Sequence, residues 1–197
     1  MASLIRIFKK SDWVIQAFLF FKSHFIIILA LGLIAAFGRA AQLGAFGPVS
    51  SPFHFLLEII IQSARLLIFV YALGFTNVKT GLMRIKKVVT TKTAWKENWH
   101  IAIKKMKNEW PSLLTSFVIY LLIALVINEI IDYTAYQTCL YYKLKTNEII
   151  SNQASEWVII LFFKNISVIP FTLVFNALFL LWITNKISLV SGNQLKL

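Results

Sequence analysis

Four long apolar stretches alternate with polar connections along the chain. They occupy residues 25–46, 53–75, 112–131 and 157–184. About 20 consecutive apolar residues in a helix cross the hydrocarbon layer of a bilayer, so each stretch is long enough for one span. A tight turn at 47–52 joins the first two stretches, and a polar connection at 132–156 joins the last two. The pattern predicts an all-α integral membrane protein, a single polytopic membrane domain over residues 1–197 with four transmembrane helices in two hairpins.

The last apolar stretch is longer than one straight span requires. Lys164 interrupts it, and Pro170 is expected to kink it because proline removes a main-chain hydrogen bond. Two interpretations are open. The span enters at Trp157 and bends, or residues 157–163 lie at the interface and the span proper is 166–184. In both, Lys164 extends its ammonium group to the outer interface.

A basic loop at 77–111 separates the two hairpins and contains a helical repeat of apolar residues at steps of four, three, four and four. These residues are Trp95, Trp99, Ala102, Met106 and Trp110. The spacing predicts an amphipathic helix over 94–110 that lies in the headgroup layer. The lysines that accompany its last turns are Lys104, Lys105 and Lys107. A protein-docking surface and an RNA contact are the alternatives. A shorter interfacial helix is expected over 12–23, with Trp13 and Phe20 at the interface.

Three polar residues of the second span share one helical face. Glu58, Gln62 and Arg65 are spaced by four and three positions. An ionisable group in hydrocarbon costs about 2.5–3.5 kcal/mol on insertion scales, so such groups normally face protein or water. Because the turn at 47–52 brings Arg39 to the depth of Glu58, we expect these two to pair. Arg65 either lines an aqueous cavity or binds an anionic group, or it is satisfied by Gln62 and by Asn or Ser from neighbouring helices.

Small residues recur every four positions along the first span. They are Gly32, Ala36, Ala40 and Gly44. A stripe of small side chains lets another helix backbone approach closely, so we expect this face to pack against a second helix.

The composition indicates that the chain is embedded in a membrane, and the distribution of charge indicates how the chain is oriented in it. Hydrophobic residues make up 58% and charged residues 14% of the chain, and its mean hydropathy is +0.73. Residues 77–111 carry nine basic and two acidic side chains, which is +7 of the net +12, whereas the 132–156 connection is acidic. The positive-inside rule then places both termini and the basic loop in the cytoplasm. A composition rich in Lys, Ile and Asn suggests an AT-rich bacterial genome and hence an inner membrane.

No residue pattern indicates catalysis. The sequence contains no H-E-x-x-H, G-x-S-x-G, P-loop or glycine-rich dinucleotide motif. His24 and His100 are expected on one side of the membrane and His54 on the other, so they cannot share a metal ion. Cys139 has no second cysteine to pair with. We therefore expect no enzyme activity, no cofactor and no metal; a lipid-modifying enzyme with an unfamiliar site is the least favoured alternative.

Two functions fit these patterns. The first is a non-enzymatic assembly, accessory or regulatory subunit that binds anionic lipid or a cytoplasmic protein through the basic loop and interfacial helix. The second is a homo-oligomeric channel, pore or small transporter with Arg65 and Lys164 lining the path, one form of which is a membrane effector of a bacterial defence or toxin system. Nucleic acid is a disfavoured partner, because positive-inside bias and lipid attraction account for the charge.

Overall fold

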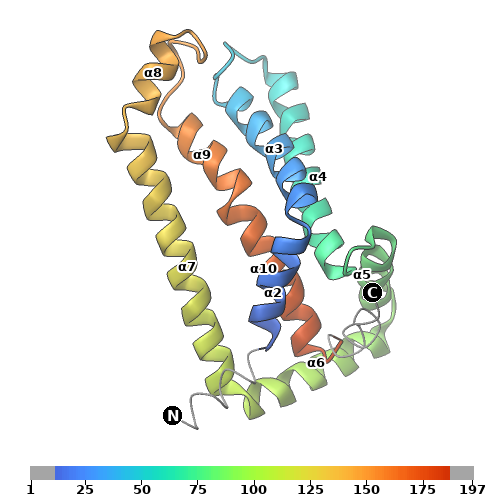
Figure 1. Cartoon of the computed structure of the whole chain (residues 1–197). Coiled ribbons are helices and arrows are strands. Elements are labelled where there is room, and N and C mark those ends of the chain that lie inside the picture. Colours follow the sequence, from blue (N-terminus) through green and yellow to red (C-terminus); the bar gives the residue numbers. More distant parts are fainter. Residues whose placement is uncertain (1–11, 187–197) are drawn as a thin grey trace, which may run out of the picture. The chain divides into compact units, whose positions relative to one another are not determined.

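The computed structural model describes residues 12–186, and this part of the chain is all-helical, without a strand (Figure 1). Its helices, in chain order, are α2 (Asp12–Ser23), α3 (Phe25–Gln42), α4 (Ser51–Leu73), α5 (Val78–Thr90), α6 (Lys92–Asn108), α7 (Trp110–Gln137), α8 (Leu140–Thr146), α9 (Trp157–Ile166) and α10 (Val168–Ile183).

Four helical runs within residues 12–186 are long and apolar enough to span a membrane. They are α3, α4, α7 and the run Trp157–Ile183 that α9 and α10 share. Their ends differ from the apolar stretches because turn chemistry, not hydropathy, sets them. Helix α3 stops at Gln42, before Gly44 and Gly47 adopt positive φ. Helix α7 begins at Trp110, since Pro111 is tolerated in a first helical turn.

The last helical run is broken at Ser167, three residues before the proline expected to kink it. Ser167 has φ −125° and ψ −82° and separates α9 from α10. Pro170 has no N–H group, so it cannot donate the hydrogen bond that the Ile166 carbonyl would receive in a continuous helix. The missing bond explains why the break lies before the proline and not at it.

Within the basic loop expected at 77–111, the segment before α6 forms a further helix, α5. Asn77 caps this helix, and its side-chain oxygen accepts a hydrogen bond from the Thr80 main-chain N–H at 3.2 Å. A short helix, α8, also lies in the 132–156 connection. Gly74, which follows α4, and Gly81, which lies in α5, let the two helices approach closely. A Cβ at either position would collide with main-chain atoms of the facing segment.

Packing divides the chain into two compact units. The described part of unit 1 comprises residues 12–24, 69–121 and 173–186, and unit 2 comprises residues 25–68 and 122–172.

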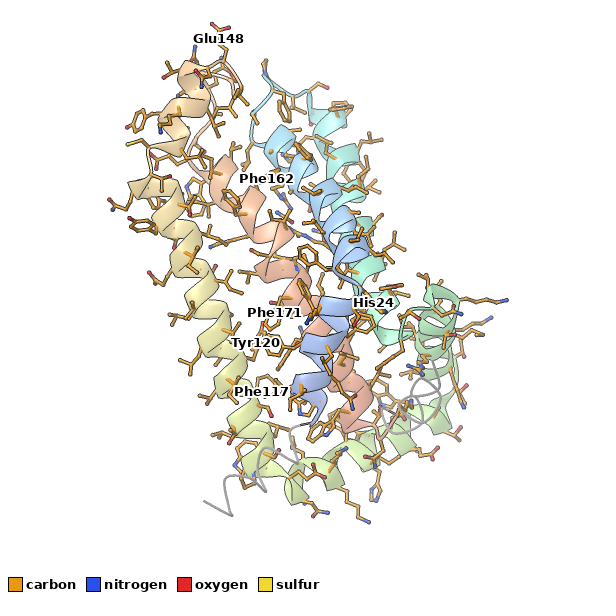
Figure 2. The ribbon with its side chains drawn as sticks, viewed as in Figure 1. His24, Phe117, Tyr120, Glu148, Phe162 and Phe171 are labelled. Carbon is orange, nitrogen blue, oxygen red and sulfur yellow. The ribbon has the colours of Figure 1, made fainter. Side chains whose placement is uncertain are left out.

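Unit 1 is built on an aromatic core. Trp13 is fully buried, with its ring centroid 4.6 Å from that of Phe175 and 5.6 Å from that of Trp182. Phe117 and Tyr120 project from α7 toward α10, and their rings lie 6.1 Å and 4.1 Å from Phe175 (Figure 2). The expectation that Trp13 lies at the membrane interface is therefore wrong, because the indole is enclosed by aromatic side chains. Phe20 is likewise buried.

Unit 2 is built on close packing of α3 against α9. Gly32 faces the α9 backbone so closely that a Cβ there would lie 3.0 Å from the Asn165 main-chain oxygen. Ala36 and Ala40 are also buried. Gly32 and Ala40 of the small-residue face thus pack against α9, Ala40 in a cluster with Val158. Gly44 departs from the stripe: it lies past the end of α3 with φ +75°, in the turn.

Candidate functional site

A polar network in unit 2 connects α3 to α4. The Arg39 guanidinium donates to the Glu58 carboxylate, with Nη1–Oε2 at 3.0 Å and Nη2–Oε1 at 3.4 Å. Gln42 Nε2 donates to Glu58 Oε2 at 3.1 Å and to the His54 main-chain oxygen at 2.9 Å. Gln62 Nε2 donates to Glu58 Oε1 at 2.7 Å. Both carboxylate oxygens are therefore occupied by donors from within the unit.

The local sequence explains this arrangement. Arg39 lies in the last turn of α3, and Glu58 lies two turns into α4, so the short turn between the helices places them at one level. The ion pair expected from that turn is present. Gln42 is one turn beyond Arg39, and its Oε1 accepts from Arg39 Nη1 at 2.7 Å, which fixes the guanidinium.

Arg65 is satisfied within unit 2 by an amide. Its Nη2 and Nε donate to Asn165 Oδ1 at 2.7 Å and 3.2 Å. Asn165 is almost fully buried, and its Nδ2 donates to the Leu161 main-chain oxygen at 2.7 Å, which holds the acceptor toward Arg65. Of the alternatives left open by the sequence, the contact with Asn from a neighbouring helix is the one observed. Gln62 bonds to Glu58 and makes no hydrogen bond to Arg65 among the described residues.

Lys164 is half-buried on α9, one position before Asn165. Its ammonium group makes no hydrogen bond or ion pair with any residue between 12 and 186. The structure therefore does not bring Lys164 into the Arg39–Glu58 network or onto the Arg65 contact.

The surface of α6 combines exposed indoles with lysines. Trp95 and Trp99 are 56% and 59% exposed, and their rings stack with centroids 6.3 Å apart. Trp110 is 53% exposed but begins α7, since the helix that was expected to reach it ends at Asn108. No residue of α6 is buried within its unit. The indoles thus lie on the protein surface and not in the core.

Most cations of α5 and α6 have no acidic partner. Seven of their lysine side chains make no hydrogen bond or ion pair to the described residues: Lys79, Lys86, Lys87, Lys92, Lys96, Lys104 and Lys107. The exposed positive charge of these seven lysines is consequently not neutralised by ion pairs with residues 12–186.

The other two cations of this segment cap helix C-termini. Arg84 Nη1 donates to the Leu73 main-chain oxygen at 2.5 Å, at the end of α4. Lys105 Nζ donates to the Trp182 main-chain oxygen and to Asn185 Oδ1, both at 2.8 Å, at the end of α10. Carbonyls of a last helical turn have no intrahelical donor and favour a cation. Burial lowers the pKa of Arg84 and of Lys105 from their ordinary values.

The histidines and the cysteine lie apart. His24 lies against Phe20 in unit 1 with the two rings tilted, His54 lies in the first turn of α4, and His100 is exposed on α6. Cys139 is exposed and precedes α8 with φ +53°. Across residues 12–186 no three His, Cys, Asp or Glu side chains gather closely enough to hold a metal ion.

Three side chains that make these contacts were not anticipated from the sequence: Gln42, Asn165 and Arg84. Gln42 could have been found, because it lies three positions after Arg39 on the same helical face. Asn165 contacts Arg65 across 100 positions of sequence, and Arg84 reaches a main-chain oxygen of another helix, so neither contact has a local signal.

Comparison of the chain with models of protein families, with curated protein sequences and with solved structures found no match.

Proposed function

We propose that this chain is a four-span, non-enzymatic protein of a bacterial inner membrane that acts as an assembly, accessory or regulatory subunit. In this proposal α3 with α4, and α7 with the α9–α10 run, are two hairpins, and both termini are cytoplasmic. The α5–α6 segment lies along the cytoplasmic surface and binds anionic lipid headgroups. The charge asymmetry between the basic loop and the acidic 132–156 connection supports the orientation.

One observation carries the proposal. The successive helices α5 and α6 expose seven lysines that have no partner within residues 12–186, and α6 also carries two stacked, exposed tryptophans. Indoles favour the boundary between headgroups and acyl chains, and each lysine near an anionic surface contributes about 1 kcal/mol of attraction. Arg84 and Lys105 attach this segment to the ends of α4 and α10, so its surface is held beside candidate spans.

Hydrogen exchange of α6 in the full-length protein tests the proposal. The protein is reconstituted in nanodiscs of phosphatidylcholine with or without phosphatidylglycerol, and exchange of the peptides from α6 is followed by mass spectrometry. We expect slower exchange in the anionic discs, and loss of that difference in the double variant Trp99→Ala/Lys104→Glu. Lys22→Glu, at an exposed lysine of α2, is the matched control and should keep the difference. Equal exchange of wild-type α6 in both discs would contradict the proposal.

A channel or pore is a second candidate, and Lys164 is the observation that favours it. This cation lies within a candidate span and has no partner among the described residues. Arg65 is the weaker choice for a lining residue because Asn165 holds it. Ion flux in liposomes tests the candidate. A pore predicts flux that changes in Lys164→Met while assembly is retained. Wild-type protein that gives no flux would reject it.

A further inference from the structure

Unit 2 contains a cavity of about 220 Å³ between α3, α8 and α9. Phe37 on α3 and Phe162 on α9 meet edge to face at its wall, with ring centroids 5.2 Å apart; Phe162 is labelled in Figure 2. Leu144 of α8 and Ile149 of the loop after it complete the opposite side. Every residue lining the cavity is apolar. A polar ligand would therefore lose its hydrogen bonds to water and gain none, which selects for hydrocarbon.

The size of the cavity suits a segment of hydrocarbon. An apolar cavity of roughly 150 Å³ stays dry and can bind benzene, and this one is larger. The atoms that line an empty cavity lack dispersion contacts on one side, so an apolar occupant would stabilise this part of the protein. The wall is also fixed: the Ser151 main-chain N–H donates to the Ala45 main-chain oxygen at 2.7 Å and ties the loop after α8 to the turn after α3.

The rim of the cavity reaches the surface of the unit. Phe37, Phe46 and Ile149 are 53%, 64% and 57% exposed, whereas Ala45 and Val158 are buried beneath them. Phe37 lies on α3, a candidate span, whereas Phe46 and Ile149 lie in the connections that follow α3 and α8. In a membrane this exposed apolar rim therefore adjoins acyl chains at the end of the span. In that setting hydrocarbon chains are the apolar molecules at the highest local concentration.

Positive charge lies on the helix that forms one wall. Lys145 is one position after the lining residue Leu144, and its Nζ donates to the Tyr141 hydroxyl at 2.8 Å and lies 4.9 Å from the centroid of that ring. Lys143 is exposed on the same short helix. A cation held beside an apolar cavity matches a molecule with an acyl chain and an anionic phosphate.

We propose that this cavity binds one acyl chain of a membrane phospholipid, with Lys143 and Lys145 supplying positive charge near its phosphate. The proposal rests on the membrane location proposed above and goes beyond it, since it assigns a specific lipid site remote in sequence from the α5–α6 segment.

Photo-crosslinking tests it on the full-length protein. Nanodiscs are prepared with a phosphatidylglycerol that carries a diazirine in one acyl chain, and crosslinked residues are mapped by mass spectrometry. We expect crosslinks on peptides from α8 and its following loop in excess of those on α7, whose apolar side chains are more exposed. Leu144→Trp, which fills the cavity, should reduce the α8 crosslinks severalfold. Leu121→Trp, at an exposed position of α7, is the control and should leave them unchanged.

The possible outcomes separate the two proposals. Equal crosslinking of α8 in the wild type and in Leu144→Trp would overturn the proposed lipid site, while the proposed membrane location would stand. Absence of crosslinks on every candidate span would overturn the membrane location, and the lipid site with it. If Leu144→Trp does not fold, as judged by thermal unfolding, Ile149→Trp replaces it, because that side chain is an exposed part of the rim.

Discussion

The ammonium group of Lys105 lies 2.8 Å from the main-chain oxygen of Trp182 and 4.3 Å from the centroid of its indole ring. It thus caps α10 and makes a cation–π contact with the same residue. In a run that also includes the exposed Lys104 and Lys107, one lysine is committed to the structure and the other two remain on the surface.

Lys105→Met should destabilise the protein more than Lys104→Met. The first removes the hydrogen bonds to the Trp182 carbonyl and the Asn185 side chain as well as the cation–π contact, which together contribute about 1–2 kcal/mol. The second removes an exposed charge of the same kind. Unfolding in detergent, followed by circular dichroism, measures both. Equal stability of the two variants would mean that the Lys105 contacts contribute nothing.

Reversal of either charge in the Arg39–Glu58 pair should destabilise unit 2. Glu58→Arg and Arg39→Glu each place like charges in contact and disrupt the Gln42 bonds, at a cost of about 1–3 kcal/mol. The double reversal should recover most of that loss in the same unfolding measurement. Glu58→Arg combined with Lys143→Glu has the same net charge and should show no recovery. A double reversal no better than the worse single variant would argue against the pair.

Substitution of Gly32 should loosen the contact between α3 and α9. A Cβ there meets two main-chain atoms, the Asn165 oxygen at 3.0 Å and the Ile166 Cα at 3.3 Å, which cannot rotate away as a side chain would. Gly32→Val should therefore cost about 1–3 kcal/mol through overpacking. Ala30→Val, at an exposed position of the same helix, is the control. Unfolding of both variants at the same denaturant concentration would show that α3 and α9 are not closely packed at Gly32.

Acidification should destabilise unit 1 through His24. Burial against Phe20 and Tyr71 lowers the pKa of His24 below its ordinary value of 6.5. As pH falls through 6.5, the unfolded chain takes up a proton that the folded chain resists, so the free energy of unfolding decreases. At pH values well above 6.5, the protonation of His24 does not affect the free energy of unfolding.

His24→Phe keeps an aromatic ring against its neighbours and should reduce the loss of stability between neutral and mildly acidic pH. His100→Phe, at an exposed histidine of α6, leaves His24 in place and should retain the loss. Melting temperatures measured across this pH range distinguish the two. A pH profile unchanged in His24→Phe would assign the effect to another group.

The apolar runs predicted the four membrane-length helices because length and hydropathy are local properties of the chain. The Arg39–Glu58 contact was also predictable, since only a short turn separates the two helices. Trp13 was misplaced because amphipathic spacing cannot tell an indole that faces lipid from one that faces Phe175. The Arg65–Asn165 contact depends on how distant helices pack, which no local pattern encodes.

Unit 1 draws its described residues from three segments that are far apart in the sequence, and this has a consequence for the order of events during synthesis. Trp13 is made long before Phe175 and Trp182, the aromatic residues that enclose it. Lys105 likewise has no partner at the end of α10 until that helix has been made. The Trp13 indole must therefore remain unpaired, or be shielded by lipid or a chaperone, until the spans between α2 and α10 have been synthesised.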